Sequence, residues 1–411
     1  MDKKEIFLKN DFTLIKEGSA DFYVHVADIP SKSMKVFYNK KMELNRDVSC
    51  LAVKAYSNLF NQKTLVIVDC MAASGISSIR MIKECNKIKR IFINDINPVA
   101  IDLIHKNIKL NNITGKNPEF IISQKDANLL FSEIAQNSNP RLKTSQERPN
   151  LISIDPFGTP NRYVDNAFKA IQKTNGLLCI TATDTAVLFG VRPQACIRKY
   201  MSKPLHTEYC KEIAARILVH FIARLANINK LGIIPLLTFY SNHFIRVFAL
   251  TVQSQKKISN YFKNYGFIIH CHNCGYRSIE NDILAIPSQC PVCGDSGKLD
   301  YAGPLWVGKL HDDIFIKEIL NLNSKFSYSN QKKLDKILTF ALDEINMPAL
   351  YYNIHKLSQK LKLQKVPKME DILKIITKQG YRGSRTHFDF ISIKTDMGYE
   401  MLVKLILEKY K

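Results

Sequence analysis

The sequence is poor in acidic residues and has no long apolar stretch. It contains 37 Asp and Glu against 59 Lys and Arg, which gives a formal net charge of +22 and a pI near 9.4. This excess favours a polyanionic partner, with nucleic acid ahead of an anionic membrane surface. No run approaches the roughly 18 apolar residues of a membrane span, and residues 1–5 lack the apolar run of a signal peptide. We therefore expect a cytoplasmic protein that does not enter a membrane.

The cysteines lack the density of a disulfide framework, because six of the ten are scattered along 411 residues. The other four form a C-x2-C-x15-C-x2-C pattern: Cys271, Cys274, Cys290 and Cys293, with a glycine after each pair. This spacing predicts a tetrahedral zinc site with four thiolate ligands. A redox role for either pair is the alternative. We expect a structural zinc ion that closes a ribbon over residues 268–298, which is too small to bury a core alone.

The three-glycine fingerprint of a dinucleotide site is also missing. An apolar strand over residues 64–68 leads into Asp69, a turn of small residues with a single glycine, Gly75, and then a helix. This is the opening of a nucleotide-binding βαβ unit, in which small residues let the backbone approach the ligand. A second strand ends at Asp95, twenty residues after Gly75, where an acid can hold both ribose hydroxyls. One glycine with this acid suits an adenosyl ligand without phosphates, namely S-adenosyl-L-methionine.

Strands and helices continue to alternate along the first half of the chain. We expect strands over 120–122, 151–154 and 177–181, and helices over 98–110 and 163–173. This alternation predicts an α/β fold with a doubly wound parallel sheet. Asp126 and Ala127 follow the third strand, at the place where such folds supply a polar group to the adenine amino group.

The stretch Asp155-Pro156-Phe157-Gly158 directly follows the fourth strand. Ligands of open α/β sheets bind in the crevice at the carboxyl ends of the strands. A carboxylate beside an aromatic ring suits a planar substrate that carries an amino group, because the ring stacks while the acid accepts an N–H bond. Asp155 and Phe157 are therefore candidate catalytic residues. A plain Pro-Gly turn after a strand is the alternative.

A helix is expected over residues 48–59, with Asn45 or Asp47 as its cap. Arg46 would then lie near the helix N-terminus, where the macrodipole disfavours a cation. This mismatch indicates that Arg46 serves the carboxylate of a ligand. A surface arginine is the alternative.

The last third of the chain predicts a separate domain, so that residues 1–255 and 256–411 form two domains. Helices are expected over 332–345, 351–361 and 369–378, followed by a basic, β-prone segment over 381–394. Three helices and a basic hairpin predict a winged-helix-like module. Residues 351–411 hold 13 Lys and Arg against 6 Asp and Glu, which suits a surface that follows phosphates. A solvated charged face is the alternative.

Several motifs in order resemble those of the tRNA guanine-N2 dimethyltransferase family. They are Phe37-Tyr38-Asn39, Asn45-Arg46-Asp47, Asp155-Pro156-Phe157-Gly158, Thr181-Ala182-Thr183-Asp184, Tyr301-Ala302-Gly303-Pro304-Leu305-Trp306, and the segment from Gly380 to Phe388. The resemblance covers nearly the whole chain. It implies a Rossmann-like class I methyltransferase fold with a C-terminal α+β domain that binds tRNA. It also implies transfer of one or two methyl groups from S-adenosyl-L-methionine to the 2-amino group of a guanosine, at position 26 in the family.

The resemblance also implies roles for single residues. The family's methyl-donor contacts map onto Arg46, Asp95, Asp126 and Ala127, and its catalytic acid maps onto Asp155. Ser77 departs from the pattern, since archaeal relatives place an arginine two residues after the motif glycine. Either the cofactor's carboxylate loses one contact, or Arg80 or Arg46 replaces that arginine.

Two other functions remain open at this level. The chain could be a zinc-containing nucleic-acid-binding regulator whose α/β domain only senses a ligand. A Rossmann oxidoreductase is disfavoured by the missing glycines. No stable protein partner is indicated by the sequence.

Overall fold

The computed structural model describes residues 12–25, 34–115, 117–140, 146–255, 258–259 and 262–410. The chain divides into two compact units. Unit 1 consists of Met1–Ala182, Phe248–Gln253 and Lys317–Asp335, and unit 2 of Thr183–Val247, Ser254–Ile316 and Lys336–Lys411. The division at residue 255 into a methyltransferase domain and a tRNA-binding domain is a functional one and stays a prediction.

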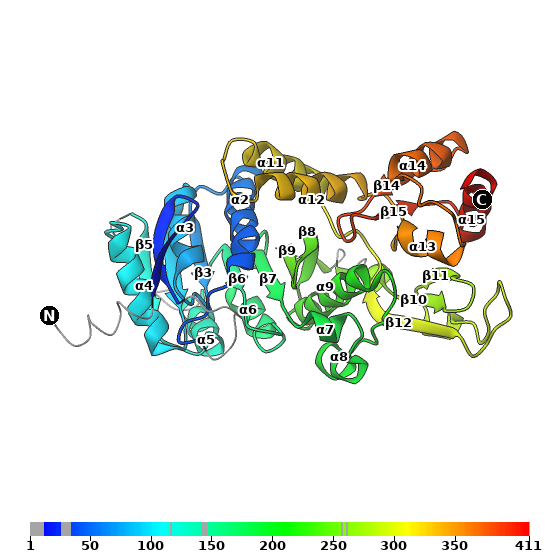
Figure 1. Ribbon diagram of the computed structural model, residues 1–411. Helices are drawn as coiled ribbons and strands as arrows, with labels where there is room; N and C mark the ends of the chain where they lie inside the picture. The colour runs from blue at the N-terminus through cyan, green and yellow to red at the C-terminus, as the bar shows by residue number, and fades with distance from the viewer. Residues whose placement is uncertain are drawn as a thin grey trace. The chain divides into compact units, whose positions relative to one another are not determined.

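Unit 1 is built on parallel strands in the order β5-β4-β3-β6-β7, followed by the end of β9 (Figure 1). The strands are β3 (Leu65–Asp69), β4 (Ile88–Asn94), β5 (Glu119–Ser123), β6 (Leu151–Ile154), β7 (Leu177–Ala182) and β9 (Phe244–Val252). All residues of β3, β6 and β7 are buried, which fits their continuous apolar sequences. The order runs outward from β3 to β5 and then returns to β6, so the topological switch point lies between β3 and β6. The predicted doubly wound sheet is confirmed.

Helices alternate with these strands. They are α2 (Glu43–Leu59), α3 (Ile76–Glu84), α4 (Pro98–Leu110), α5 (Ala127–Asn137) and α6 (Val164–Ala170). The expectation that Asn45 or Asp47 caps a helix beginning at Val48 is wrong, because α2 begins five residues earlier and has no side-chain cap. Both residues lie inside the helix and are buried, so their side chains serve tertiary contacts.

An N-terminal hairpin belongs to unit 1. It pairs β1 (Thr13–Glu17) with β2 (Ala20–Val24), and β2 packs on α3 and α4. The rest of the N-terminal extension, residues 1–11 and 26–33, lies outside the described residues. Unit 1 also contains the end of α11 (Asp313–Asn323) and the start of α12 (Gln331–Asp343).

Unit 2 places its longest helix, α9 (Cys210–Ile228), against β8 (Gly232–Ser241) and against β12 of a small antiparallel sheet. That sheet has the order β11-β10-β12, with β10 at Tyr265–Cys271, β11 at Arg277–Glu280 and β12 at Leu299–Trp306. It contains the predicted zinc ribbon. The remaining short helices are α7 (Thr185–Leu188), α8 (Pro193–Tyr200), and the 3-10 turns η1 (Lys40–Met42, in unit 1), η2 (Phe262–Asn264) and η3 (Ile283–Ala285).

The C-terminal module of unit 2 has its own apolar core, which includes Ile354, Ile372, Ile393 and Leu402. Its elements are β13 (Tyr352–Asn353), α13 (Ile354–Lys360), α14 (Met369–Lys378), β14 (Gly383–Arg385), β15 (Ser392–Thr395) and α15 (Tyr399–Tyr410). The basic segment forms the expected antiparallel pair of strands, whereas α15 was not predicted. The finer assignment to the winged-helix class stays a prediction. None of the helices in the described ranges combines the length and the apolar composition needed to cross a membrane.

Candidate active site and metal centre

Four aspartates stand at the carboxyl ends of neighbouring parallel strands in unit 1. Asp69 ends β3, Asp95 follows β4, and Asp155 follows β6, while Asp126 lies three residues after β5. Because the strand order is β5-β4-β3-β6, these residues lie along one edge of the sheet. Asp69 and Asp155 lie on either side of the switch point, where open α/β sheets bind their ligands.

The Asp155 carboxylate is held from one side by α2. The Asn45 side-chain amide donates a hydrogen bond to Asp155 Oδ2 at 3.1 Å. Asn45 is only 2% exposed, so this contact fixes the orientation of the carboxylate. No described residue forms a hydrogen bond with the other oxygen, Oδ1, and Asp155 is only partly buried. This oxygen therefore retains its capacity to accept a hydrogen bond from a substrate.

An aromatic ring stands beside this carboxylate in the sequence. Phe157 is 48% exposed, which is unusual for a phenylalanine that follows a fully buried strand. The rings of Phe157 and Phe37 form a T-shaped pair, with centroids 5.3 Å apart and planes at 89°. Gly158 has a φ of +101°, a left-handed conformation that a side chain disfavours. The turn therefore leaves an aromatic surface open to a ligand.

Asp95 ties two loops of the sheet edge together. Its Oδ2 accepts a hydrogen bond from the Ala73 backbone N–H at 2.8 Å, and Oδ1 accepts one from Asn97 N–H at 2.9 Å. Burial raises the pKa of Asp95, although these N–H groups favour its charged form. Gly75 has a φ of +79°, and a Cβ there would lie 3.2 Å from Ile104 Cγ1. The turn before α3 therefore requires glycine and presents its backbone closely.

The other predicted cofactor residues differ in accessibility. Asp69 is buried, and its Oδ2 accepts a hydrogen bond from the Ser78 hydroxyl at 2.7 Å, which anchors the start of α3. Asp126 is exposed and caps α5 by accepting a hydrogen bond from Asn128 N–H at 2.8 Å. Ala127, the first residue of that helix, is buried. Helix α5 itself was not predicted.

Arg46 is paired with an acid of this chain. Its Nε and Nη2 donate to the two carboxylate oxygens of Glu17 at 2.5 and 2.7 Å. Burial opposes the ionisation of Glu17, but the charges of Arg46 and Arg80 outweigh it and hold the Glu17 pKa below its ordinary value. Sequence reasoning missed Glu17, because no local pattern connects it to a residue 29 positions away.

Arg80 is fully buried and forms ion pairs with Glu17, Asp47 and Glu84 at 3.0, 2.8 and 2.9 Å. Three carboxylates already surround its guanidinium group. Its role in this structure is to join β1, α2 and α3. Of the two arginines considered as substitutes at the Ser77 position, only Arg46 retains some exposure, at 11% of its side chain.

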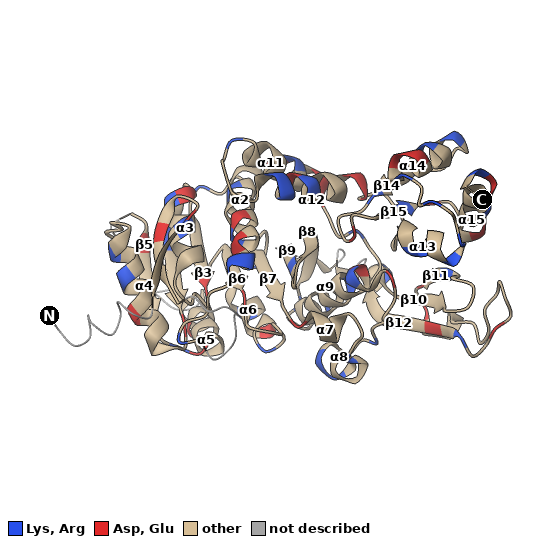
Figure 2. Cartoon of the chain, in the orientation of Figure 1, with Lys and Arg blue, Asp and Glu red and all other residues tan. Residues whose placement is uncertain are grey.

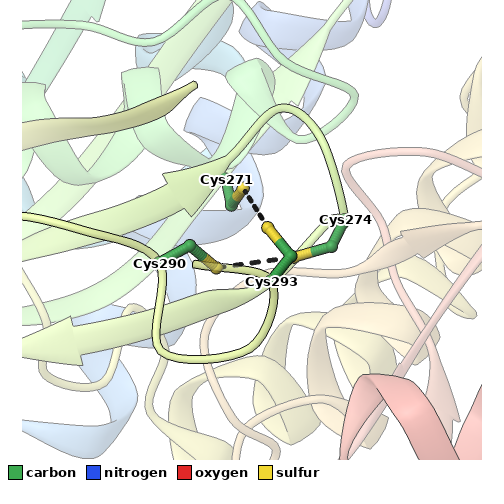
Figure 3. A group of neighbouring side chains, drawn as sticks. All are labelled: Cys271, Cys274, Cys290 and Cys293. Atoms are coloured by element: carbon green, nitrogen blue, oxygen red, sulfur yellow. Dashed lines mark hydrogen bonds between the residues drawn. The ribbon is translucent and has the colours of Figure 1, made fainter. Parts of the chain in front are cut away.

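The four motif cysteines come together in unit 2 (Figure 3). The sulfurs of Cys271 and Cys293 are 3.7 Å apart, and those of Cys274 and Cys290 are 3.5 Å apart. A zinc ion with four sulfurs at about 2.3 Å requires sulfur–sulfur distances of about 3.8 Å, so the cluster fits. A disulfide would need a distance of about 2.05 Å. All four residues are free thiols.

The glycines after each cysteine pair have the expected conformation. Gly275 and Gly294 have φ values of +86° and +70°. Their N–H groups bond to the carbonyls of Cys271 and Cys290, both at 2.9 Å. The next N–H, that of Tyr276, points at Cys274 Sγ at 3.4 Å. This is the arrangement in which backbone dipoles stabilise thiolates that hold a metal.

A second buried group in unit 2 has residues of metal-ligand type: His311, Glu344 and His387. The Glu344 oxygens already have partners, because His387 Nδ1 donates to Oε1 and Thr386 Oγ1 donates to Oε2 at 2.7 Å. Lys394 Nζ also lies 3.1 Å from Oε2. A neighbouring ammonium group disfavours a cation, so this group is an ion-pair cluster of the scaffold. No local sequence pattern predicts this cluster, because its three residues lie far apart along the chain.

Comparison with known proteins now identifies the family. The sequence profile of "N2,N2-dimethylguanosine tRNA methyltransferase" matches residues 18–407. The chain belongs to this family. A tRNA (guanine(26)-N(2))-dimethyltransferase from Methanosphaera stadtmanae is 35% identical over 399 residues, covering 97% of both chains. The enzyme of the same name from Methanothermobacter thermautotrophicus is 35% identical over 385 residues, covering 93% of this chain and 96% of the relative.

A solved structure of the dimethylguanosine methyltransferase family agrees with the fold. Trm1 from Pyrococcus horikoshii, in complex with S-adenosyl-L-methionine, superposes with a TM-score of 0.79 at 30% sequence identity. The match covers 96% of this chain and 99% of that chain. The predicted Rossmann-like methyltransferase architecture is therefore confirmed. The regulator considered as an alternative receives no support, because the matched relatives are named as methyltransferases.

Proposed function

We propose that this protein transfers methyl groups from S-adenosyl-L-methionine to the 2-amino group of a guanosine in tRNA. The observation that carries the proposal is the Asp155 carboxylate, oriented by Asn45 and followed by a half-exposed Phe157, at the switch point of a sheet of this family. Guanosine 26 is the target that the relatives' names specify. One or two methyl additions at that nitrogen are both compatible with the proposal.

Methyl-donor binding is assigned to the edge formed by β3, β4 and β5. S-adenosyl-L-methionine supplies an electrophilic methyl group on a positively charged sulfur. Asp95 would accept a further hydrogen bond from a ribose hydroxyl, because its two oxygens offer about four lone-pair sites and backbone N–H groups do not fill them all. Asp126 and Ala127 would contact the adenine, and the backbone before α3, with Gly75 and Asp69 at its ends, would lie against the donor. Arg46 would bind the donor's carboxylate in exchange for Glu17.

Asp155 is assigned the chemical step. The 2-amino group of guanine is a weak nucleophile, because its lone pair is delocalised into the ring. Asp155 Oδ1 would accept an N–H bond from this amine and orient its lone pair. As the nitrogen bonds to the methyl carbon, the bond from that carbon to the donor's sulfur breaks, S-adenosylhomocysteine leaves, and Asp155 takes up the proton released by the nitrogen. Phe157 would stack on the base. Asn45 would keep the carboxylate in one orientation throughout.

A tRNA partner fits the charge of the chain. The net charge is +22, and Figure 2 shows Lys and Arg on many helices, α8 and α12 among them. Enzymes that modify a base inside a folded RNA must extract it from its stack, which requires a firm grip on the surrounding backbone. The Lys and Arg residues of both units can supply this grip.

We also propose zinc as the occupant of the four-cysteine cluster. The sulfur separations and the N–H contact to Cys274 fit a thiolate-bound ion. Its chemistry would be to neutralise the thiolates and hold the two knuckles of the ribbon together. None of the candidate catalytic residues belongs to the ribbon.

The decisive experiment replaces the proposed base. Asp155→Ala should lower the rate of methyl transfer by about 100- to 10,000-fold, because it removes a general base. The affinity for tRNA should remain near that of the wild type. Mass spectrometry of tRNA nucleosides after incubation with isotopically labelled methyl donor provides the rate. Asp102→Ala, which removes an exposed carboxylate from α4, is the matched control. Near-normal turnover of the Asp155 variant would overturn the assignment.

A further inference from the structure

A second polar pocket lies in unit 2, where the zinc ribbon meets the C-terminal module. Its volume is about 250 Å³. His272, Gly275 and Arg277 line it from the ribbon, and Tyr352, Lys356 and Lys360 from the module. A hydrogen bond from Lys360 Nζ to the Asn273 carbonyl, at 3.3 Å, connects the two sides. None of the residues assigned to methyl transfer lines this pocket.

The pocket carries a net positive charge. Its lining includes one acid, Glu208, which is paired with Arg277 at 3.1 Å. Two cations then remain, Lys356 and Lys360, both exposed. They are four residues apart on α13, so they project from the same face of the helix. Two ammonium groups one turn apart can hold the oxygens of a single phosphate.

A third cation, Arg277, belongs to the wall of the pocket. Arg277 is 10% exposed, and its Nη1 and Nη2 donate to the Tyr351 carbonyl and to Glu208 at 2.8 and 3.1 Å. Its buried Nε has no hydrogen-bond partner among the described residues. This atom is shielded from solvent, so Arg277 would act on an anion in the pocket through its positive charge and not through a hydrogen bond from Nε.

Aromatic rings make this wall rigid. Tyr352 stacks with Tyr399 at a centroid distance of 6.0 Å and an angle of 17°. The Arg277 guanidinium lies 4.2 Å from the centre of the Tyr352 ring, and both residues line the pocket. The cation is therefore held by packing, in addition to its ion pair.

We propose that this pocket binds a phosphodiester of the tRNA backbone, as an anchoring site separate from the guanosine that is methylated. Lys356 and Lys360 contact the non-bridging oxygens, and Arg277 closes the inner side. The pocket is too small for a large ligand but accommodates one phosphate with its ribose. Because Gly275 belongs to a zinc knuckle, the ribbon acquires a specific role, which is to form one wall of an RNA contact. This inference rests on the proposed tRNA substrate.

The test is the double variant Lys356→Ala/Lys360→Ala in the full chain. Its tRNA affinity is measured at several salt concentrations beside the wild type. Loss of the contacts to this one phosphate should reduce the slope of log Kd against log salt by about 1. Between ~50 and ~200 mM salt, the wild type should therefore lose about fourfold more affinity than the variant. The kcat at saturating tRNA should be unchanged.

The matched control is Lys374→Ala/Lys378→Ala, which removes two exposed lysines at the same spacing from α14. It should keep the slope of the wild type. Lys356→Arg/Lys360→Arg should restore the slope, because the charges return. An unchanged slope in the alanine variant, or an equal loss in the control, overturns the inference. Failure of the wild type to methylate any tRNA would instead overturn the proposed function.

Discussion

Two carboxylates, one in each unit, show contrasting uses of the same chemical group. Asp155 in unit 1 accepts one hydrogen bond from Asn45 and keeps the rest of its capacity. Glu344 in unit 2 is buried and receives hydrogen bonds from His387 and Thr386, with Lys394 alongside. Spare capacity at a partly exposed acid marks a place for a ligand. A carboxylate whose oxygens are fully occupied marks the scaffold.

This difference teaches how to separate function from stability in the chain. In unit 2, polar groups that pair with each other, or that would bind a metal, should contribute to the stability of the folded state. Strand-end groups of unit 1 should matter for ligands and turnover. The comparison would fail if a substitution of Asp155 lowered the stability of the fold. It would also fail if a substitution of Glu344 lowered turnover without lowering stability.

The largest effect is expected from removal of the zinc ion that we propose for the four-cysteine cluster. Structural zinc contributes about 10–16 kcal/mol in isolated zinc-finger peptides, so a chelator or Cys274→Ser should unfold the ribbon. Limited proteolysis across residues 268–298 and metal content by mass spectrometry report this loss. Cys210→Ser, at another partly buried thiol outside the cluster, is the control and should retain the metal. Binding of the methyl donor should survive. A ribbon that resists protease without metal would contradict the prediction.

A smaller effect is expected at Glu344. Glu344→Ala leaves Lys394 buried with one fewer acid and removes the partner of His387, which should destabilise the protein by about 3–5 kcal/mol. Urea unfolding measures the change. Asp155→Asn preserves the contact with Asn45, so its cost should stay below about 1 kcal/mol. Equal losses in the two variants would contradict the comparison.

The dependence of stability on pH provides an independent test of the ion-pair cluster around Glu344. Burial opposes the ionisation of Glu344, but Lys394 and His387 outweigh it and hold its pKa far below the ordinary value. A depressed pKa stabilises the folded state above the unfolded pKa of about 4.3, and this stability is lost as the pH falls below it. Glu344→Gln should therefore flatten the decline of the urea midpoint between about pH 5 and pH 3.

The smallest effect is expected at Asp95. Asp95→Asn keeps an oxygen for one backbone N–H but loses the charge and an acceptor for the ribose, so donor affinity should fall about tenfold, or about 1.4 kcal/mol. Calorimetric titration with S-adenosylhomocysteine measures it. Stability should change little. Unchanged affinity would remove Asp95 from the donor site.

Local patterns predicted much of this molecule. The parallel strands, α4, the cysteine cluster and the strand-end position of Asp155 follow from short runs of residues whose physics is local. Contacts between distant residues could not be predicted in this way. The pairs of Arg46 with Glu17 and of Lys394 with Glu212 join residues 29 and 182 positions apart. Asn45 was expected as a helix cap because its burial, and its bond to Asp155, depend on tertiary packing.

The discontinuity of unit 1 has a consequence for synthesis. Tyr328 donates to Glu84 at 2.7 Å, and Asn330 donates to Asp47 at 3.0 Å, so residues 317–335 complete the ion cluster around Arg80. The ribosome must translate the cysteine ribbon, residues 268–298, before this segment emerges. A nascent chain ending at residue 255 would contain every candidate catalytic residue, yet its arginine cluster would still lack these two partners. Unit 1, which holds the candidate catalytic residues, is thus complete only after most of the chain has been made.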